Sequence, residues 1–261
     1  MRCTLGVLGL VAVGCAHTPV SASALDSLER PAFIARIEEG AGPKSVVFRD
    51  DAASYAKRLK TLDAREADRR LTLKLEKGTD KERSINRYQV ADSLRAQVVS
   101  ELPRTRPWTR MLPPAQVATV LESFLVDEVP ANAPDVTRLE PLGVDSILEI
   151  VIEDYGMRSK GGKAGIYLYG YAQLYKVKGG TLYRRAFFSD ELNAGLEHLD
   201  PFDVAKSPTL FANRVKSMLQ AIAHQIALDL SPATRTAQQD TPPAKLESAP
   251  PPAKPAEEDP L

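Results

Sequence analysis

Two short motifs in the chain contain residue types that enzymes use for nucleophilic or phosphoryl chemistry. Ser54-Tyr55-Ala56-Lys57 has the S-x-x-K spacing of penicillin-recognising enzymes, in which the lysine helps to activate the serine. The sequence has neither the Ser-Asp-Asn nor the Lys-Thr-Gly motif of those enzymes. Residues 156–163 (GMRSKGGK) resemble a phosphate-binding loop, but Gly162 and Ala164 stand where that loop needs Lys and Ser/Thr. Neither motif therefore predicts catalysis.

Acidic residues on or near the ends of the predicted strands are the remaining route to hydrolysis. Paired carboxylates of this kind can cleave glycosidic bonds, and the candidates are Glu149, Glu153, Asp154, Asp190 and Glu191. Their spacing places no two of them at a catalytic separation. Glu149 shares a strand face with apolar residues and needs a partner if it is buried, for which Arg184 and Arg185 are candidates. With only three histidines and no G-x-S-x-G motif, we expect no catalytic residue, no metal site and no cofactor.

Tyrosines repeat at alternate positions in one segment of the chain. In a strand over residues 166–178, this spacing places Tyr167, Tyr169, Tyr171 and Tyr175 on one face. A two-residue turn at residues 179–180 would pair Tyr175 with Arg184 and Tyr171 with Phe188. The candidate binding surface is therefore Tyr167, Tyr169, Tyr171, Tyr175, Arg184 and Phe188. The alternative is an ordinary sheet face that helices cover, with the phenol groups hydrogen-bonded.

Hydrophobic periodicity predicts the elements that would position these residues. Apolar spacing indicates helices at residues 88–102, 113–125, 135–142 and 207–226, and strands at residues 146–154, 166–178 and 181–190, with a loop at 156–162. For the charged segment 50–83, the sequence fits both a helix and a strand. Asp63 and Glu66 have the spacing of a capping box at the start of a helix, whereas Leu71, Leu73 and Leu75 alternate as in a strand.

The first fifteen residues have the features of a bacterial export signal. A basic start at Arg2 precedes an uncharged apolar run over residues 4–13, which is too short to span a bilayer. Ala12-Val13-Gly14-Cys15 resembles the lipobox of bacterial lipoproteins, which implies diacylglycerol and an N-acyl chain on Cys15 after removal of residues 1–14. By the same resemblance, Ala16 after the cysteine implies the periplasmic face of the outer membrane. Residues 15–30 are expected to be a tether.

Composition bounds the rest of the chain. The 261 residues have 34 basic and 34 acidic side chains, a balance that argues against a nucleic-acid partner. Both cysteines lie in the first fifteen residues, so the body has no disulfide. Residues 231–261 contain eight prolines and no aromatic residue, which predicts a disordered tail. Residues 31–230 are expected to form a single α/β domain, a mixed β-sheet with helices packed on it.

The order of these elements resembles a group of envelope proteins. Gly143-Val144-Asp145-Ser146-Ile147-Leu148-Glu149 opens the central strand, and a meander with a Gly-Gly turn follows. This pattern is similar to the N-terminal domain of TolB, to the lipoprotein CsgG and to LpoB. The resemblance implies a non-enzymatic envelope accessory protein that binds a protein partner or assembles with itself. The alternative is a lipoprotein that binds or hydrolyses peptidoglycan.

Lipidation of Cys15 can be tested directly, because no other cysteine remains after cleavage. Metabolic labelling with palmitate should mark the wild-type protein and leave the Cys15→Ser variant unmarked. Equal labelling of the two proteins would end the lipoprotein assignment.

Overall fold

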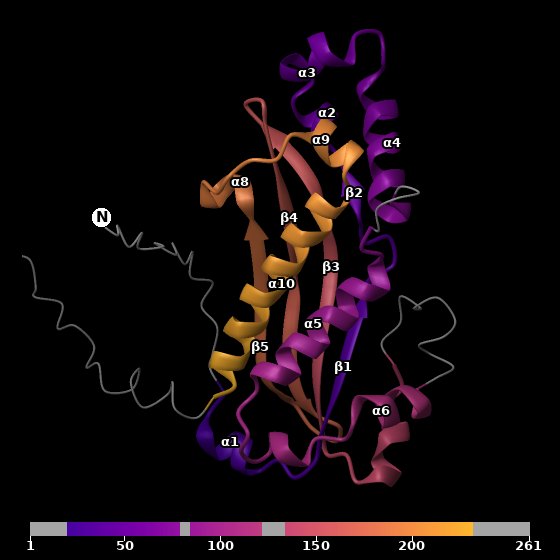
Figure 1. Ribbon diagram of the computed structural model, residues 1–261. Helices are drawn as coiled ribbons and strands as arrows, with labels where there is room; N and C mark the ends of the chain where they lie inside the picture. The colour runs from indigo at the N-terminus through magenta and orange to yellow at the C-terminus, as the bar shows by residue number, and fades with distance from the viewer. Residues whose placement is uncertain (1–19, 79–83, 122–133, 232–261) are drawn as a thin grey trace, which may run out of the picture.

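Strand β3 (Ser146–Lys160) lies at the centre of a mixed five-stranded sheet in the computed structural model, which describes residues 20–78, 84–121 and 134–231 (Figure 1). Strands β1 (Pro31–Ile37) and β2 (Lys44–Ser45) follow one another along one edge of β3, both parallel to it. Strand β4 (Lys163–Lys176) pairs antiparallel with the other edge, and β5 (Thr181–Asp190) pairs antiparallel with β4. The chain therefore forms the expected α/β domain with a mixed sheet.

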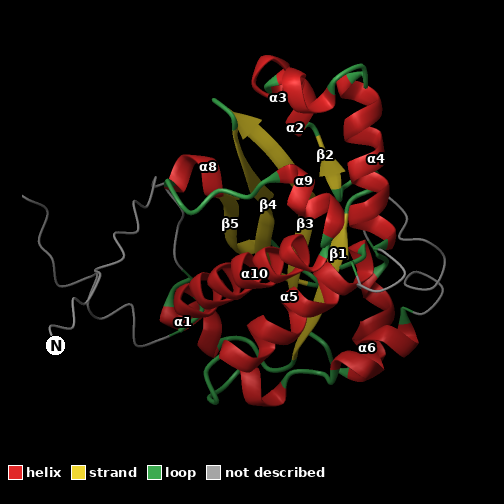
Figure 2. Cartoon of the chain, turned by 45° about the horizontal axis from the view of Figure 1, so that its top comes forward, coloured by secondary structure: helices red, strands yellow, loops and turns green. Residues whose placement is uncertain are grey.

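Two long helices cover one face of this sheet. Helices α5 (Arg87–Glu101) and α10 (Thr209–Asp229) pack against each other and lie across the strands (Figures 1 and 2). Their buried stripes, which include Leu94 and Val215, join a core with Leu148, Ile150 and Leu174 of the sheet. Both helices were predicted, because their apolar residues recur at helical spacing.

The opposite face of the sheet is covered at one end by short elements. Helix α6 (Pro114–Val120) and the 3-10 helix η2 (Val136–Leu142) form a second, smaller core with Ile34 and Ile147. Tyr175 packs against this cluster. The predicted helix over residues 113–125 is observed as far as Val120, and residues 122–125 lie outside the described residues.

At the other end of the sheet, the segment that the sequence left open is helical. Helices α2 (Val47–Asp50), α3 (Ala52–Leu59) and α4 (Ala64–Lys77) lie beside α9 (Pro201–Lys206). The Asp63 side chain accepts from the first turn of α4, as an N-cap does. Leu71 and Leu75 are buried one turn apart while Leu73 is exposed, so the leucine alternation marks a helix face rather than a strand.

The predicted tether over residues 15–30 is wrong from residue 20 onward. Helix α1 (Ala22–Asp26) begins after the N-cap Ser21, and the residues around it, Val20, Leu25 and Leu28, are buried in the main core. Asp145 fixes the chain further by accepting the N–H groups of residues 29 and 30. Short polar sequence suggested a linker, but its few apolar residues pack on the domain. The predicted signal peptide, residues 15–19 and the tail from 232 lie outside the described residues.

The connection between β3 and β4 is much shorter than the predicted loop at residues 156–162. Strand β3 continues to Lys160, and the turn consists of Gly161 and Gly162, both at positive φ. Two left-handed residues are what a type I′ hairpin turn requires. Gly156 is therefore a residue of strand β3. A side chain would not fit there, because β2 passes so close that a Cβ atom would be 2.1 Å from the Lys44 carbonyl oxygen.

The hairpin of β4 and β5 has a different register from the predicted one. Strand β4 ends at Lys176, so the turn has four residues instead of two, and Val177 packs against the smaller core. As a result, Tyr169 pairs with Phe188 and Tyr171 with Ala186. From Tyr167 to Leu174 the shift is two residues, which keeps these side chains and their partners on the predicted face, and a bulge at Leu174/Tyr175 makes the shift three at Tyr175.

Gly170 offers a test of this packing, because a Cβ atom there would lie 2.0 Å from the Val151 carbonyl oxygen and 2.9 Å from the Phe187 ring. We expect Gly170→Ala to lower the free energy of unfolding by about 1–3 kcal/mol or more, as overpacking does. Gly180→Ala is the matched control, since nothing lies within 4 Å of its Cβ position. Urea titrations that give both variants the same midpoint would contradict the described strand contact.

Candidate functional site

The six residues predicted as a binding surface lie on one face of β4 and β5, which we call the tyrosine face: Tyr167, Tyr169, Tyr171, Tyr175, Arg184 and Phe188. It is the face opposite α5 and α10. Phe188 is 60% exposed and Arg184 is also exposed, whereas Tyr169 and Tyr171 are half-buried and Tyr167 is buried. The face is therefore open at its centre and along β5, and closed at its two ends.

Aromatic rings form a ladder across the two strands. The Tyr167 and Tyr169 ring centroids are 6.1 Å apart and nearly parallel, and the Phe188 ring lies 6.3 Å from Tyr169. Next to this ladder, the Arg184 guanidinium carbon lies 4.3 Å from the centroid of the Tyr171 ring. Such contacts hold rings in place and present flat apolar surface beside a cation. The cation and the extra ring expected beside the tyrosines are both present, although each faces a different tyrosine from the one predicted.

A buried ion pair lies beside the open part of the tyrosine face, on the same side of the sheet. The Arg36 Nε atom donates to Glu149 at 2.6 Å, and the Gln173 amide donates to the other Glu149 oxygen at 2.6 Å. Arg36 also donates to the Tyr171 hydroxyl at 3.2 Å. Burial disfavours the charge of Arg36, but the hydrogen bond and the charge of Glu149 outweigh it and raise the pKa of Arg36.

The partner of Glu149 is therefore Arg36 of β1, and not Arg184 or Arg185 as predicted. Arg184 lies over Tyr171, and Arg185 forms an ion pair with Asp229 of α10. Arg36 comes from a strand 113 residues earlier in the chain, so no local pattern pairs the two. The sequence signal that could have indicated a buried partner for Glu149 is the single arginine in the apolar segment PAFIARI.

The upper end of the tyrosine face is closed by a second polar group. Asp154 accepts from the Gly42 backbone N–H at 2.8 Å, from the Lys44 ammonium at 3.1 Å and from the Tyr167 hydroxyl at 3.3 Å. Burial and the nearby Asp154 charge raise the pKa of Tyr167, and burial also raises the pKa of Tyr171 and Tyr175. These three phenols therefore stay protonated near neutral pH and act as hydrogen-bonding groups, not as nucleophiles.

Most of the predicted carboxylates have a structural partner. Asp190 is paired with Arg158 and caps helix α8 (Glu191–Ala194) through the Leu192 N–H. Glu191 accepts the Ile166 backbone N–H and lies 3.2 Å from Arg214. Together with Glu149 and Asp154, these groups hold strands and helix ends in place. They do not form a pair of free acids on either side of a cleft.

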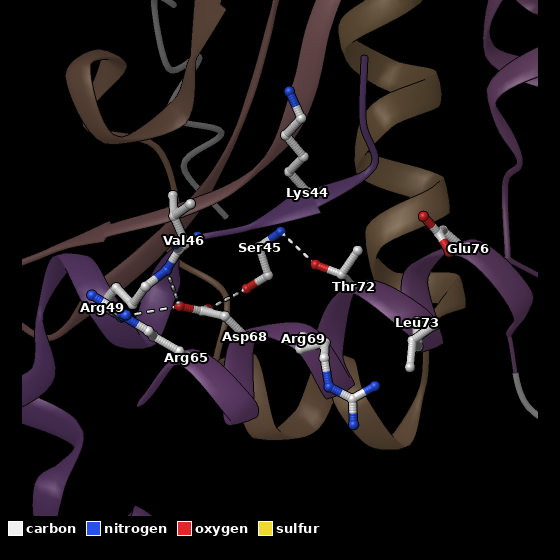
Figure 3. A pocket seen from close by; sticks show the side chains of 10 residues that line it. All are labelled: Lys44, Ser45, Val46, Arg49, Arg65, Asp68, Arg69, Thr72, Leu73 and Glu76. Carbon is white, nitrogen blue, oxygen red and sulfur yellow. Dashed lines mark hydrogen bonds and ion pairs between the residues drawn. The ribbon is translucent and has the colours of Figure 1, made fainter. Parts of the chain in front are cut away.

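A shallow hollow of about 380 Å³ lies between β2 and α4, away from the tyrosine face (Figure 3). Its one deeply buried acid, Asp68, accepts from the Ser45 hydroxyl at 2.7 Å and from two N–H groups at the start of α2, each at 3.1 Å. Arg49 pairs with the same carboxylate. The lining residues are Lys44, Ser45, Val46, Arg49, Arg65, Asp68, Arg69, Thr72, Leu73 and Glu76. The Asp68 carboxylate contacts the Ser45 hydroxyl, but it also accepts two backbone N–H groups and pairs with Arg49, so its contacts are those of a structural group that holds α2 and β2 on α4.

The remaining sequence candidates are dispersed over the domain. Ser54 and Lys57 lie exposed on α3, and His224 lies on the solvent side of α10 beside Glu101. Among the described residues, no cluster of His, Cys, Asp and Glu side chains has the arrangement of a metal site. No described helix is long and apolar enough to cross a bilayer. Cys15 lies outside the described residues.

Comparison with known proteins gives distant structural likenesses alone. No protein-family model and no curated protein sequence matches the chain. The hypothetical protein CT253 of Chlamydia trachomatis aligns over 63% of this chain and 73% of its own, with 8% identity and a TM-score of 0.31. Lipoprotein GNA1162 of Neisseria meningitidis aligns over 76% of this chain and 98% of its own, with 14% identity and a TM-score of 0.32. Similarity at this level does not assign a function.

The ion pair between Arg36 and Glu149 can be tested with a double-mutant cycle. Arg36→Met should lower the free energy of unfolding by about 3–5 kcal/mol, because it leaves the Glu149 charge buried without its partner. Adding Glu149→Met should restore much of this loss, as removal of both buried charges does. Urea denaturation of the two single variants and the double variant measures the coupling.

The matched control for this cycle is Lys178→Met, which breaks an ion pair with Glu140 at the surface. It should cost less than about 1 kcal/mol, as exposed pairs do. Additive losses for Arg36 and Glu149 would show that the two charges do not support each other.

Proposed function

We propose that this protein is a lipid-anchored envelope accessory protein that binds a protein partner, or a second copy of itself, through the tyrosine face and without catalysis. The observation that supports this best is the exposed centre of that face. Phe188, Arg184 and the half-buried Tyr169 and Tyr171 form one continuous surface of rings and a cation. Aromatic residues and arginine are the side chains most enriched at the centres of protein interfaces.

The construction of this surface also favours binding. Its residues are on paired strands and not on loops, and Tyr171 is held in place by its hydrogen bond to Arg36. A side chain that is already fixed loses little conformational entropy when a partner binds. The surface therefore has both the chemistry and the rigidity that an interface needs.

The proposed lipid anchor on Cys15 supports a location in the bacterial envelope. A lipobox-like sequence ends at Cys15, and Val20, five residues later, is buried in the domain. Diacylglycerol and an N-acyl chain on Cys15 would hold the domain at the periplasmic face of the outer membrane, and a multiply acylated cysteine makes this attachment stable. No cofactor other than this covalent lipid is part of the proposal.

The second candidate is binding of peptidoglycan to the same face. The ring of Phe188 is exposed beside Tyr169, and flat aromatic rings are suitable for stacking against sugars. Hydrolysis has less support than binding, because Glu149, Asp154, Asp190 and Glu191 all have structural partners.

Substitutions on the open part of the face separate binding from folding. Phe188→Ala, Tyr169→Ala and Tyr171→Ala should each weaken self-association or partner capture at least about fivefold, which corresponds to ~1 kcal/mol. The thermal midpoint should change little for Phe188→Ala, which is largely exposed. The measurements are sedimentation equilibrium for self-association and in-cell crosslinking for a partner.

The matched control is Tyr88→Ala, an exposed tyrosine on α5. It should change neither quantity. Lost stability with intact association in the Tyr169 and Tyr171 variants would make the tyrosine face part of the core. Weaker binding of soluble peptidoglycan fragments to the Phe188 variant, with unchanged protein association, would favour the second candidate.

A further inference from the structure

The folded domain begins very close to the proposed site of lipid attachment. Val20 is 1% exposed and belongs to the main core, and it follows Cys15 by five residues. Five residues span at most about 18 Å even when fully extended. If Cys15 carries lipid, as the proposed function requires, the part of the domain around Val20 must stay within that distance of the membrane surface.

This part of the domain is one end of the sheet. Helix α1 lies beside the last turns of α5 and α10, the 3-10 helix η1 (Trp108–Arg110) and the turn between β4 and β5 (Figure 1). The Trp108 indole N–H donates to the Leu230 carbonyl at the end of α10, and both residues share a core with Leu25 and Leu28. We call this region the α1 end.

Three arginines are exposed together on the α1 end. Arg104, Arg106 and Arg110 lie within seven residues of sequence, on the loop after α5 and on η1. None of the three forms an ion pair with another described residue, although many other arginines in the described part of the chain do so. Within the described part of the chain, no acid neutralises these three charges.

The acids of the α1 end are mostly engaged elsewhere. Glu140 pairs with Lys178, Asp135 with Arg138, and Asp145 accepts two backbone N–H groups. Asp26 and Glu29 near α1, and Glu101 in the last turn of α5 beside His224, are the acids that remain exposed there. The loop from α5 to η1 presents only positive charge to solvent.

We propose that the α1 end rests on the membrane, with Arg104, Arg106 and Arg110 binding the phosphates of anionic phospholipid headgroups. Arginine is well suited to this role because its guanidinium forms two hydrogen bonds to one phosphate. Clusters of basic side chains beside a membrane anchor are attracted to anionic lipid surfaces. The five residues from Cys15 to Val20 select this end of the domain, and the three exposed arginines supply positive charge there.

The proposal fixes how the rest of the domain is presented. Strand β3 has 15 residues and is therefore about 50 Å long. With the α1 end on the membrane, α2, α3 and α4 at the other end of the sheet point away from the bilayer. The strands of the tyrosine face then run away from the membrane surface, and a partner beside the domain can reach that face.

Basic residues at the far end serve as a matched control. Lys44 pairs with Asp154, Arg49 with Asp68, Arg58 with Asp200, and Arg69 with Glu66. Arg65 of α4 is exposed as well and forms no ion pair with another described residue, so it matches the three arginines in charge and exposure. All of these cations lie at the opposite end of the sheet from α1 (Figure 1).

The test uses the full lipidated chain in vesicles that contain a nitroxide-labelled headgroup lipid. The mature chain has no cysteine other than Cys15, so Thr109→Cys at the α1 end and Lys57→Cys at the far end can each carry one fluorophore. With phosphatidylethanolamine and phosphatidylglycerol, we expect at least threefold stronger quenching at position 109 than at position 57. Replacing phosphatidylglycerol with phosphatidylcholine should remove most of that difference.

Two sets of charge substitutions complete the test. Arg104→Gln, Arg106→Gln and Arg110→Gln together should reduce the quenching at position 109 to its value on phosphatidylcholine. Arg58→Gln, Arg65→Gln and Arg69→Gln together should leave it unchanged, and thermal midpoints check that both variants are folded. Equal quenching at positions 109 and 57 would overturn the proposed orientation. Quenching at position 109 that changes neither with lipid charge nor with the arginine substitutions would overturn it as well.

Vesicle flotation separates this failure from failure of the anchor. A chain that floats with the vesicles but shows no preferred end refutes the orientation alone. A chain that does not float with the vesicles is not lipid-anchored, which refutes the orientation and the proposed anchor together.

Discussion

The ion pair of Arg36 and Glu149 connects the first strand of the domain to the surface on which its function depends. Arg36 belongs to β1 and Glu149 to β3, and the same two side chains also hold Tyr171 and Gln173 of β4. A buried charge is stable only beside its partner, so β1, β3 and β4 must stay in one register for the pair to exist. The shape of the tyrosine face follows from that register.

The two faces of the sheet have different roles because helices cover them unequally. Helices α5 and α10 bury the side that carries Leu148, Ile150 and Leu174. On the other side, α6 and η2 bury only the end near Tyr175, while Asp154 and Lys44 close the end near Tyr167. Rings and a cation are left at the centre, where a fully covered face would have aliphatic residues.

The two ends of the sheet differ as well, and the difference concerns charge. At the far end, several cations are paired with acids, among them Lys44, Arg58 and Arg69. At the α1 end, the loop before η1 and η1 itself have exposed arginines that form no ion pair with another described residue. The proposed anchor, the proposed lipid contact and the proposed interface therefore occupy distinct parts of one rigid domain.

Local sequence determined the elements whose signals are local. The apolar stripes of α5 and α10, the alternation in β4 and the position of the tyrosines on one face were all predictable, because period 3.6 and period 2 are written in neighbouring residues. Sequence also determined that the cysteines lie only at the start of the chain. Only the tertiary structure decided which arginine pairs with Glu149, how far β5 is shifted along β4, and that residues 20–30 pack on the core. Each of these depends on contacts between segments far apart in the chain or on how a turn packs, and such contacts leave no periodic trace in the sequence.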